Sequence, residues 1–121
     1  MSQVLIVDDD PDIRDTLCEV LRDEGYEVDT AGDGQQALDY LKTRPPPCVI
    51  LLDLMMPVMS GPELLEAQRR DPALAHVPVV LVSAARNLSA LADEIDDVDF
   101  LAKPIQLDDL FDTVSRYCPA P

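Results

Sequence analysis

Basic residues are scarce in this chain of 121 residues. Nine Lys and Arg stand against 24 Asp and Glu, which gives a formal net charge of −15. A protein that binds nucleic acid or an anionic membrane needs clustered Lys and Arg, because its partner is a dense array of negative charges. The composition therefore argues against both kinds of binding by this chain alone. It does not argue against divalent cations.

Long apolar runs are also missing. Crossing a bilayer as a helix takes about 20 apolar residues, and no stretch approaches that length. The first residues, Met-Ser-Gln, show no basic segment followed by an apolar one, so we expect no secretory leader. The three cysteines, Cys18, Cys48 and Cys118, lack metal-ligand spacing. Their odd number favours free thiols in a reducing cytosol over a disulfide framework, so we expect a cytoplasmic protein.

Hydrophobic residues nevertheless make up 47% of the chain, which is enough for one domain with one core. Apolar segments recur at 4–7, 26–30, 48–52, 77–82 and 98–102. Three of these segments (4–7, 48–52 and 77–82) are nearly continuous and rich in Val, Ile and Leu, which is typical of parallel strands buried on both faces. The segment at 26–30 alternates instead, as an edge strand does.

Helical patterns lie between the apolar segments. Asp10 and Asp33 are placed to cap two helices, and Gly25 is placed to end the first of them. The expected helices begin after Asp10 and after Asp33, and further ones cover about 62–70, 88–95 and 107–118. Five strands that alternate with helices predict an α/β fold with a parallel sheet and right-handed crossovers.

Polar residues stand where the predicted strands end. They are Asp8, Asp9 and Asp10 after the first, Asp53 after the third, Ser83 after the fourth, and Lys103 and Pro104 after the fifth. Functional groups of open α/β sheets collect beyond the carboxyl ends of the strands, so we expect these side chains at one rim. Clustered carboxylates need a compensating charge, and Mg²⁺ supplies it while leaving room for a phosphate oxygen. An aspartate can itself be the nucleophile that forms an acyl phosphate.

The order and spacing of four pieces resemble the receiver domain of two-component response regulators. The pieces are DD after the first strand, DLMMPVMSG at 53–61, SA after the fourth strand and FLAKP at 100–104. The resemblance implies a doubly wound, flavodoxin-like sheet of order 2-1-3-4-5 flanked by five helices. It places one receiver domain at 1–118, with 119–121 as a tail or the start of a linker.

The resemblance also implies a signalling function. A histidine kinase or a histidine phosphotransfer protein would donate a phosphoryl group to Asp53 with Mg²⁺ as cofactor, for which Mn²⁺ is expected to substitute. The switched face of helix 4, strand 5 and helix 5 would then bind an output protein, with no direct binding of nucleic acid or membrane. The chain would catalyse only its own phosphorylation and slow dephosphorylation, so we expect no enzyme in the usual sense.

Individual roles follow from the same resemblance. Asp53 is expected to accept the phosphoryl group, and Asp8, Asp9, Asp53 and the backbone carbonyl of Met55 to hold the Mg²⁺. Lys103 is expected to pair with the phosphoryl group. Because Met55 offers no general base at the second position after Asp53, we expect slow autodephosphorylation.

Ser83 and Phe100 are the expected switch residues. By the resemblance, Ser83 turns toward the phosphoryl group and Phe100 repacks with that movement. Phe100 stands where the family more commonly has tyrosine, so no hydroxyl is available to bond the loop in the inward state. The Lys103–Pro104 peptide bond is expected to be cis, which fixes where the lysine points. Asp10 fits a helix cap better than a metal ligand.

Two alternatives remain open at this point. Asp8-x-Asp10 resembles the first motif of haloacid-dehalogenase-type phosphatases, in which Asp8 would be the nucleophile and Asp10 the general acid, but this leaves Asp53 unexplained. A receiver that acts as an unphosphorylated scaffold is the second alternative. A flavodoxin-like cofactor site is rejected, because three aspartates after the first strand would repel a phosphate group.

Overall fold

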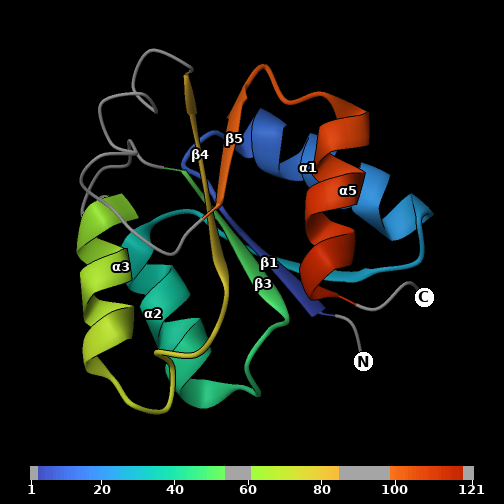
Figure 1. Cartoon of the computed structure of the whole chain (residues 1–121). Helices are drawn as coiled ribbons and strands as arrows, with labels where there is room; N and C mark the ends of the chain where they lie inside the picture. The colour runs from blue at the N-terminus through green and yellow to red at the C-terminus, as the bar shows by residue number, and fades with distance from the viewer. Residues whose placement is uncertain (1–2, 54–60, 85–98, 119–121) are drawn as a thin grey trace.

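The apolar segments form five strands of one parallel sheet in the computed structural model, which describes residues 3–53, 61–84 and 99–118 (Figure 1). The strands are β1 (Gln3–Val7), β2 (Glu27–Ala31), β3 (Val49–Asp53), β4 (Val79–Ala84) and β5 (Asp99–Lys103). Their order is β2-β1-β3-β4-β5, which confirms the predicted topology and the edge position of β2. Every residue of β3 is buried, as its continuous apolar sequence predicts.

Four helices accompany these strands in the described part of the chain. They are α1 (Pro11–Asp23), α2 (Gly34–Thr43), α3 (Gly61–Arg70) and α5 (Leu107–Tyr117). The helix expected at 88–95 lies outside the described residues, so the prediction of five helices is borne out for four. No helix in the described ranges is long and apolar enough to cross a membrane.

Capping residues set the helix ends as the sequence predicted. The Asp10 side chain accepts hydrogen bonds from the backbone N–H groups of Asp12 and Ile13, and Pro11 takes the first helical position. The Asp33 side chain caps α2 in the same way. Gly25 follows α1 with a φ of 95°, a left-handed conformation that glycine adopts without steric cost.

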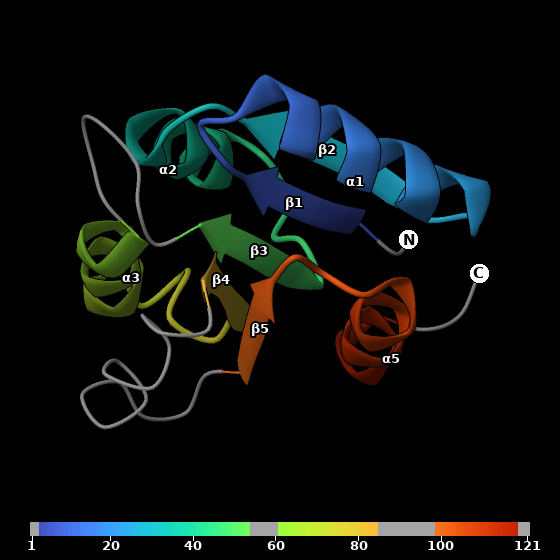
Figure 2. The same ribbon diagram turned by 90° about the horizontal axis from the view of Figure 1, so that it is seen from above.

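The helices cover the two faces of the sheet in pairs. Figure 2 shows α1 and α5 on one face and α2 and α3 on the other. On the first face, Leu21 of α1 and Leu110 of α5 pack into one buried cluster with Ile6 and Leu51 of the sheet. On the other face, side chains of α2 and α3 form a second cluster with Ile50 and its neighbours. Because both faces are covered, the polar ends of the strands are the part of the sheet left for chemistry.

A buried amide orders the connection from α3 to β4. Gln68 is 2% exposed, and its Nε2 donates hydrogen bonds to the carbonyl oxygens of Leu74 and Val77, at 2.6 and 3.0 Å. These bonds hold the turns of residues 71–77 against the end of α3. The connection lies on the carboxyl-terminal side of α3, away from the rim that carries Asp53.

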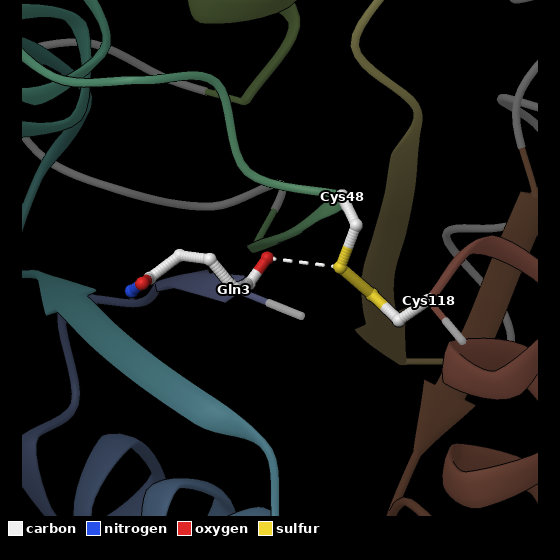
Figure 3. The surroundings of a disulfide bond; sticks show 3 residues. All are labelled: Gln3, Cys48 and Cys118. Carbon is white, nitrogen blue, oxygen red and sulfur yellow. Dashed lines mark hydrogen bonds between the residues drawn. A yellow bond between two sulfur atoms is a disulfide. The ribbon is translucent and has the colours of Figure 1, made fainter. Parts of the chain in front are cut away.

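The cysteines correct one prediction. Cys48 and Cys118, which were expected to be free thiols, form a disulfide across a sequence separation of 70 residues, with their Cα atoms 5.4 Å apart (Figure 3). Cys18 is the free cysteine and is buried, as a core thiol would be. The pair was missed because the start of β3 and the end of α5 approach each other only in the folded sheet.

Candidate acidic site at the carboxyl rim of the sheet

Three strand ends bring Asp8, Asp53 and Lys103 together. Lys103 Nζ lies 3.4 Å from Asp8 Oδ2 and 3.4 Å from Asp53 Oδ1, although the paired residues are 95 and 50 positions apart in the sequence. The carboxylate side chains of Asp8 and Asp53 are only 3% and 6% exposed, against 27% for Lys103. The sequence prediction that these residues share one rim is therefore confirmed by their geometry.

The electrostatics of this group favour the charged form of Lys103. Burial alone would lower the pKa of Lys103, but the nearby carboxylates of Asp53 and Asp8 outweigh it and hold this pKa above the usual value for lysine. A raised lysine pKa stabilises the fold fully below the usual pKa, and this contribution is lost only as the pH rises through the raised value. Lys103 is therefore a fixed positive charge at neutral pH.

The backbone around Asp8 is held from several sides. The N–H of Asp8 donates to the carbonyl of Ala31 at 3.2 Å, and the N–H of Asp10 donates to Asp8 Oδ1 at 2.9 Å. Arg14 Nη1, from the first turn of α1, donates to the Asp8 carbonyl oxygen at 2.9 Å. Sequence reasoning missed Arg14. The available signal was that Arg14 is a basic residue one helical turn after Asp10, the cap of α1.

Asp8, Asp9 and Asp53 together form a possible cation site. One carboxylate oxygen from each residue lies within 4.8 Å of the others, with Asp8 and Asp53 buried and Asp9 exposed. Oxygen ligands of this kind suit a hard divalent cation, which would also offset the repulsion among the carboxylates. The donor set fits Mg²⁺. Met55, whose carbonyl was expected to complete the ligands, lies outside the described residues.

The predicted switch residues stand on the two strands beside this group. Ser83 is buried near the end of β4 and faces Ala102 in the register between β4 and β5. Phe100 of β5 pairs with Leu81 and packs, half-buried, against the core cluster of α2 and α3. The Lys103–Pro104 peptide bond is cis, as predicted. The structure thus places Ser83 and Phe100 on neighbouring strands and leaves their movement as a prediction.

An apolar groove adjoins the acidic group. It has a volume of about 330 Å³ and lies between α1 and the segment that follows β5. Ile13 and Leu17 line one wall and Pro104 and Ile105 the other, while Lys103 connects the groove to the carboxylates. A molecule in this groove would therefore lie beside Lys103, which in turn contacts Asp53.

Comparison with known proteins decides the family. The family model of the response regulator receiver domain matches residues 4–115. The chain belongs to the response regulator receiver family. Receiver domains are signalling modules of two-component systems, not enzymes in the usual sense.

Known receivers resemble the chain along most of its length. The sporulation initiation phosphotransferase F of Bacillus subtilis is 35% identical over 120 residues, which cover 98% of this chain and 94% of that protein. The chemotaxis response regulator CheY4 of Vibrio cholerae has a similar structure, with a TM-score of 0.86, 32% identity and coverage of 97% and 98% of the two chains. The transcriptional regulatory protein SphR of Synechococcus elongatus is 34% identical, but the chain spans only 43% of its length.

The receiver assignment argues against the phosphatase alternative left open by the sequence. The acidic pocket of Asp8, Asp9 and Asp53 fits the phosphorylation site of a receiver. It accounts for Asp53, which the phosphatase alternative leaves without a role. Asp10, the general acid of that alternative, is occupied as the cap of α1.

Proposed function

We propose that Asp53 accepts a phosphoryl group from a histidine kinase or a histidine phosphotransfer protein, and that the acyl phosphate changes the surface around β5 and α5 for an output protein. The observation that carries this proposal is the convergence of Asp53, Asp8 and Lys103 at 3.4 Å contacts on one rim. A carboxylate that is buried yet paired with a cation is held ready as a nucleophile.

Each residue of the site would have a separate role in the phosphoryl transfer. An Asp53 carboxylate oxygen would attack the phosphorus and displace the imidazole nitrogen of the donor histidine, which leaves an acyl phosphate on Asp53. Lys103, already 3.4 Å from Asp53, would pair with the transferred oxygens. Arg14 fixes the Asp8 backbone and thereby the acidic pair. The buried hydroxyl of Ser83 would then bond a phosphoryl oxygen, and Phe100 would repack beside it.

Mg²⁺ is the proposed cofactor, held by Asp8, Asp9 and Asp53 and, by the resemblance, by the Met55 carbonyl. When bound, it would neutralise charge on the phosphoryl oxygens, and Mn²⁺ would do the same. We place the protein in the cytoplasm, where such kinases deliver their phosphoryl groups. The slow loss of the acyl phosphate expected from Met55 remains part of the proposal.

The test of the proposal is the location of the acyl phosphate. The chain is treated with acetyl phosphate and Mg²⁺, the product is reduced with borohydride, and the homoserine that replaces the phosphorylated aspartate is located by mass spectrometry. We expect homoserine at position 53. Homoserine at position 8 would instead support a phosphatase-like nucleophile, and no modification under conditions that label another receiver would support the scaffold alternative.

Cation binding gives a second prediction. Addition of 10 mM MgCl₂ is expected to raise the free energy of unfolding by about 1.4 kcal/mol if the dissociation constant is about a tenth of that concentration. Asp9→Asn removes an exposed ligand and is expected to lose this increase. The measurement is a urea titration with NaCl of equal ionic strength as the blank. Asp15→Asn, which removes an exposed α1 carboxylate outside the site, is expected to keep it, and an equal increase in both variants would contradict the proposed ligands.

The apolar groove gives a third prediction. Ile13→Asp places a charge in the groove, and we expect phosphotransfer from a cognate histidine kinase to slow at least about tenfold, the cost of about 1.4 kcal/mol at a docking contact. Phosphorylation by acetyl phosphate, which needs no docking surface, is expected to change less than about twofold. Gln35→Asp adds the same charge to exposed α2 and serves as the control. Equal slowing with both donors would show that Ile13 acts on the chemistry and not on docking.

A further inference from the structure

We propose that Cys48 and Cys118 form a reversible redox clamp that ties the end of α5 to the start of β3. Cys48 directly precedes β3, and Cys118 is the C-terminal cap residue of α5. Their disulfide joins segments 70 residues apart. The Cα separation of 5.4 Å lies within the range that natural disulfides use. This inference does not depend on phosphorylation at the opposite end of β3.

The backbone holds both cysteines in place without help from the sulfur–sulfur bond. The N–H of Cys48 donates to the carbonyl oxygen of Gln3 at 2.8 Å, and the N–H of Cys118 donates to the carbonyl of Val114 at 2.8 Å. Cys48 Sγ also lies 3.0 Å from the Gln3 carbonyl oxygen (Figure 3). In the reduced state the Cys48 thiol can donate its proton to that oxygen. The two thiols therefore stay close enough to form the bond again.

Access to the pair is one-sided. Cys118 is fully buried, whereas Cys48 is half-buried. A reducing thiolate such as glutathione would attack Cys48 Sγ, and the Cys118 sulfur would leave as a thiolate and take up a proton. A second glutathione then releases the Cys48 thiol, so that two glutathione molecules become one glutathione disulfide. Oxidation by glutathione disulfide is the reverse, with Cys118 attacking the mixed disulfide at Cys48.

The clamp acts on the last turn of α5. The turn also contacts β5 through Asp99, which accepts hydrogen bonds from Tyr117 and from Arg116, the latter at 3.5 Å. Burial and the bond to Asp99 raise the pKa of Tyr117 to about 12, so the phenol keeps its proton at neutral pH. Reduction would leave this polar contact and the core packing of Val114, Tyr117 and Cys118 to hold the turn, and its amides would open more often.

The clamp is tested on the full chain with Cys18→Ala, which removes the remaining thiol so that only the pair is counted. Samples are equilibrated in glutathione buffers that range from reducing to oxidising. Thiol exchange is then quenched, the protein is denatured and alkylated, and the number of alkylated cysteines is counted by intact-protein mass spectrometry. We expect no alkylated cysteine in the oxidised state, two in the reduced state, and full conversion in both directions. Hydrogen exchange of the α5 amides near Val114 is expected to be at least about tenfold faster in the reduced state.

A matched variant makes the outcome decisive. Cys48→Ser with Cys18→Ala cannot form the pair, and its α5 exchange is expected to be fast in every buffer. Equal exchange of the oxidised and reduced pair would overturn the clamp. The proposal would also be overturned if the disulfide of the folded chain stayed oxidised in reduced glutathione. It would be overturned as well if the disulfide never formed in oxidised glutathione, because the pair would then not be reversible.

Discussion

Asp53→Asn is expected to lower the rate of phosphorylation by acetyl phosphate at least about a thousandfold, which corresponds to about 4 kcal/mol of lost transition-state stabilisation. Asparagine has nearly the same volume but carries no anionic oxygen to attack phosphorus. Asp8 and Lys103, which touch each other at 3.4 Å, stay in place. The measurement is the time course of phosphoryl addition by intact-protein mass spectrometry in excess Mg²⁺.

The control for this variant is Asp33→Asn. Asp33 caps α2 with its side chain, and asparagine caps a helix about equally well, so the same chemical change is made away from the rim. We expect this variant to be phosphorylated at the rate of the unchanged chain. Rapid phosphorylation of a folded Asp53→Asn variant would contradict the assignment of Asp53, and the site found by mapping would name its replacement.

Gln68→Met is expected to lower the free energy of unfolding by about 2 to 3 kcal/mol. Methionine fills a similar volume but cannot donate the two hydrogen bonds to Leu74 and Val77, each of which contributes about 1 to 1.5 kcal/mol when buried. This is a large fraction of the total for a domain whose stability is about 5 to 15 kcal/mol. The measurement is the midpoint of urea unfolding. A lower midpoint with an unchanged dependence of the unfolding free energy on urea concentration shows a loss of stability and not a change in the compactness of the denatured state.

The chain offers a matched control for Gln68 on α2. Gln35 Nε2 donates to Asp39 Oδ1 at 3.1 Å in an exposed pair one turn apart, and such surface pairs contribute only about 0.2 to 0.5 kcal/mol. Gln35→Met is therefore expected to change the midpoint little. If both variants lost the same free energy of unfolding, the loss would come from the introduced methionine. The proposed contribution of the buried Gln68 hydrogen bonds would then be contradicted.

The parts of the fold that the sequence predicted are those with local signals. Continuous apolar runs marked β1 and β3, alternation marked β2 as an edge, and Asp10 and Asp33 marked the helix starts, because strand burial and capping depend on neighbouring residues. The rim was also predictable in outline, since every residue at the carboxyl end of a parallel strand reaches the same side of the sheet.

The parts that sequence reasoning missed depend on residues that meet only after folding. The disulfide is the clearest example, because an odd number of cysteines without regular spacing favours free thiols, and 70 residues separate the pair. Gln68 donates to backbone carbonyl oxygens, whose positions leave no pattern in the sequence, and the signal for Arg14 was only its place one turn after the cap of α1. The third helix begins at Gly61, one residue before the predicted start at about Pro62, within the usual uncertainty of a helix boundary.

The positions of Asp8, Asp53 and Lys103 along the chain have a consequence for newly made protein. Their mutual contacts span 50 and 95 residues, so the pocket does not exist until β1, β3 and β5 have all joined one sheet. A partly folded chain that lacks β5 holds Asp53 without its cation. Under the proposed function, a kinase that recognises this pocket would therefore phosphorylate only folded chains and not nascent or unfolded ones.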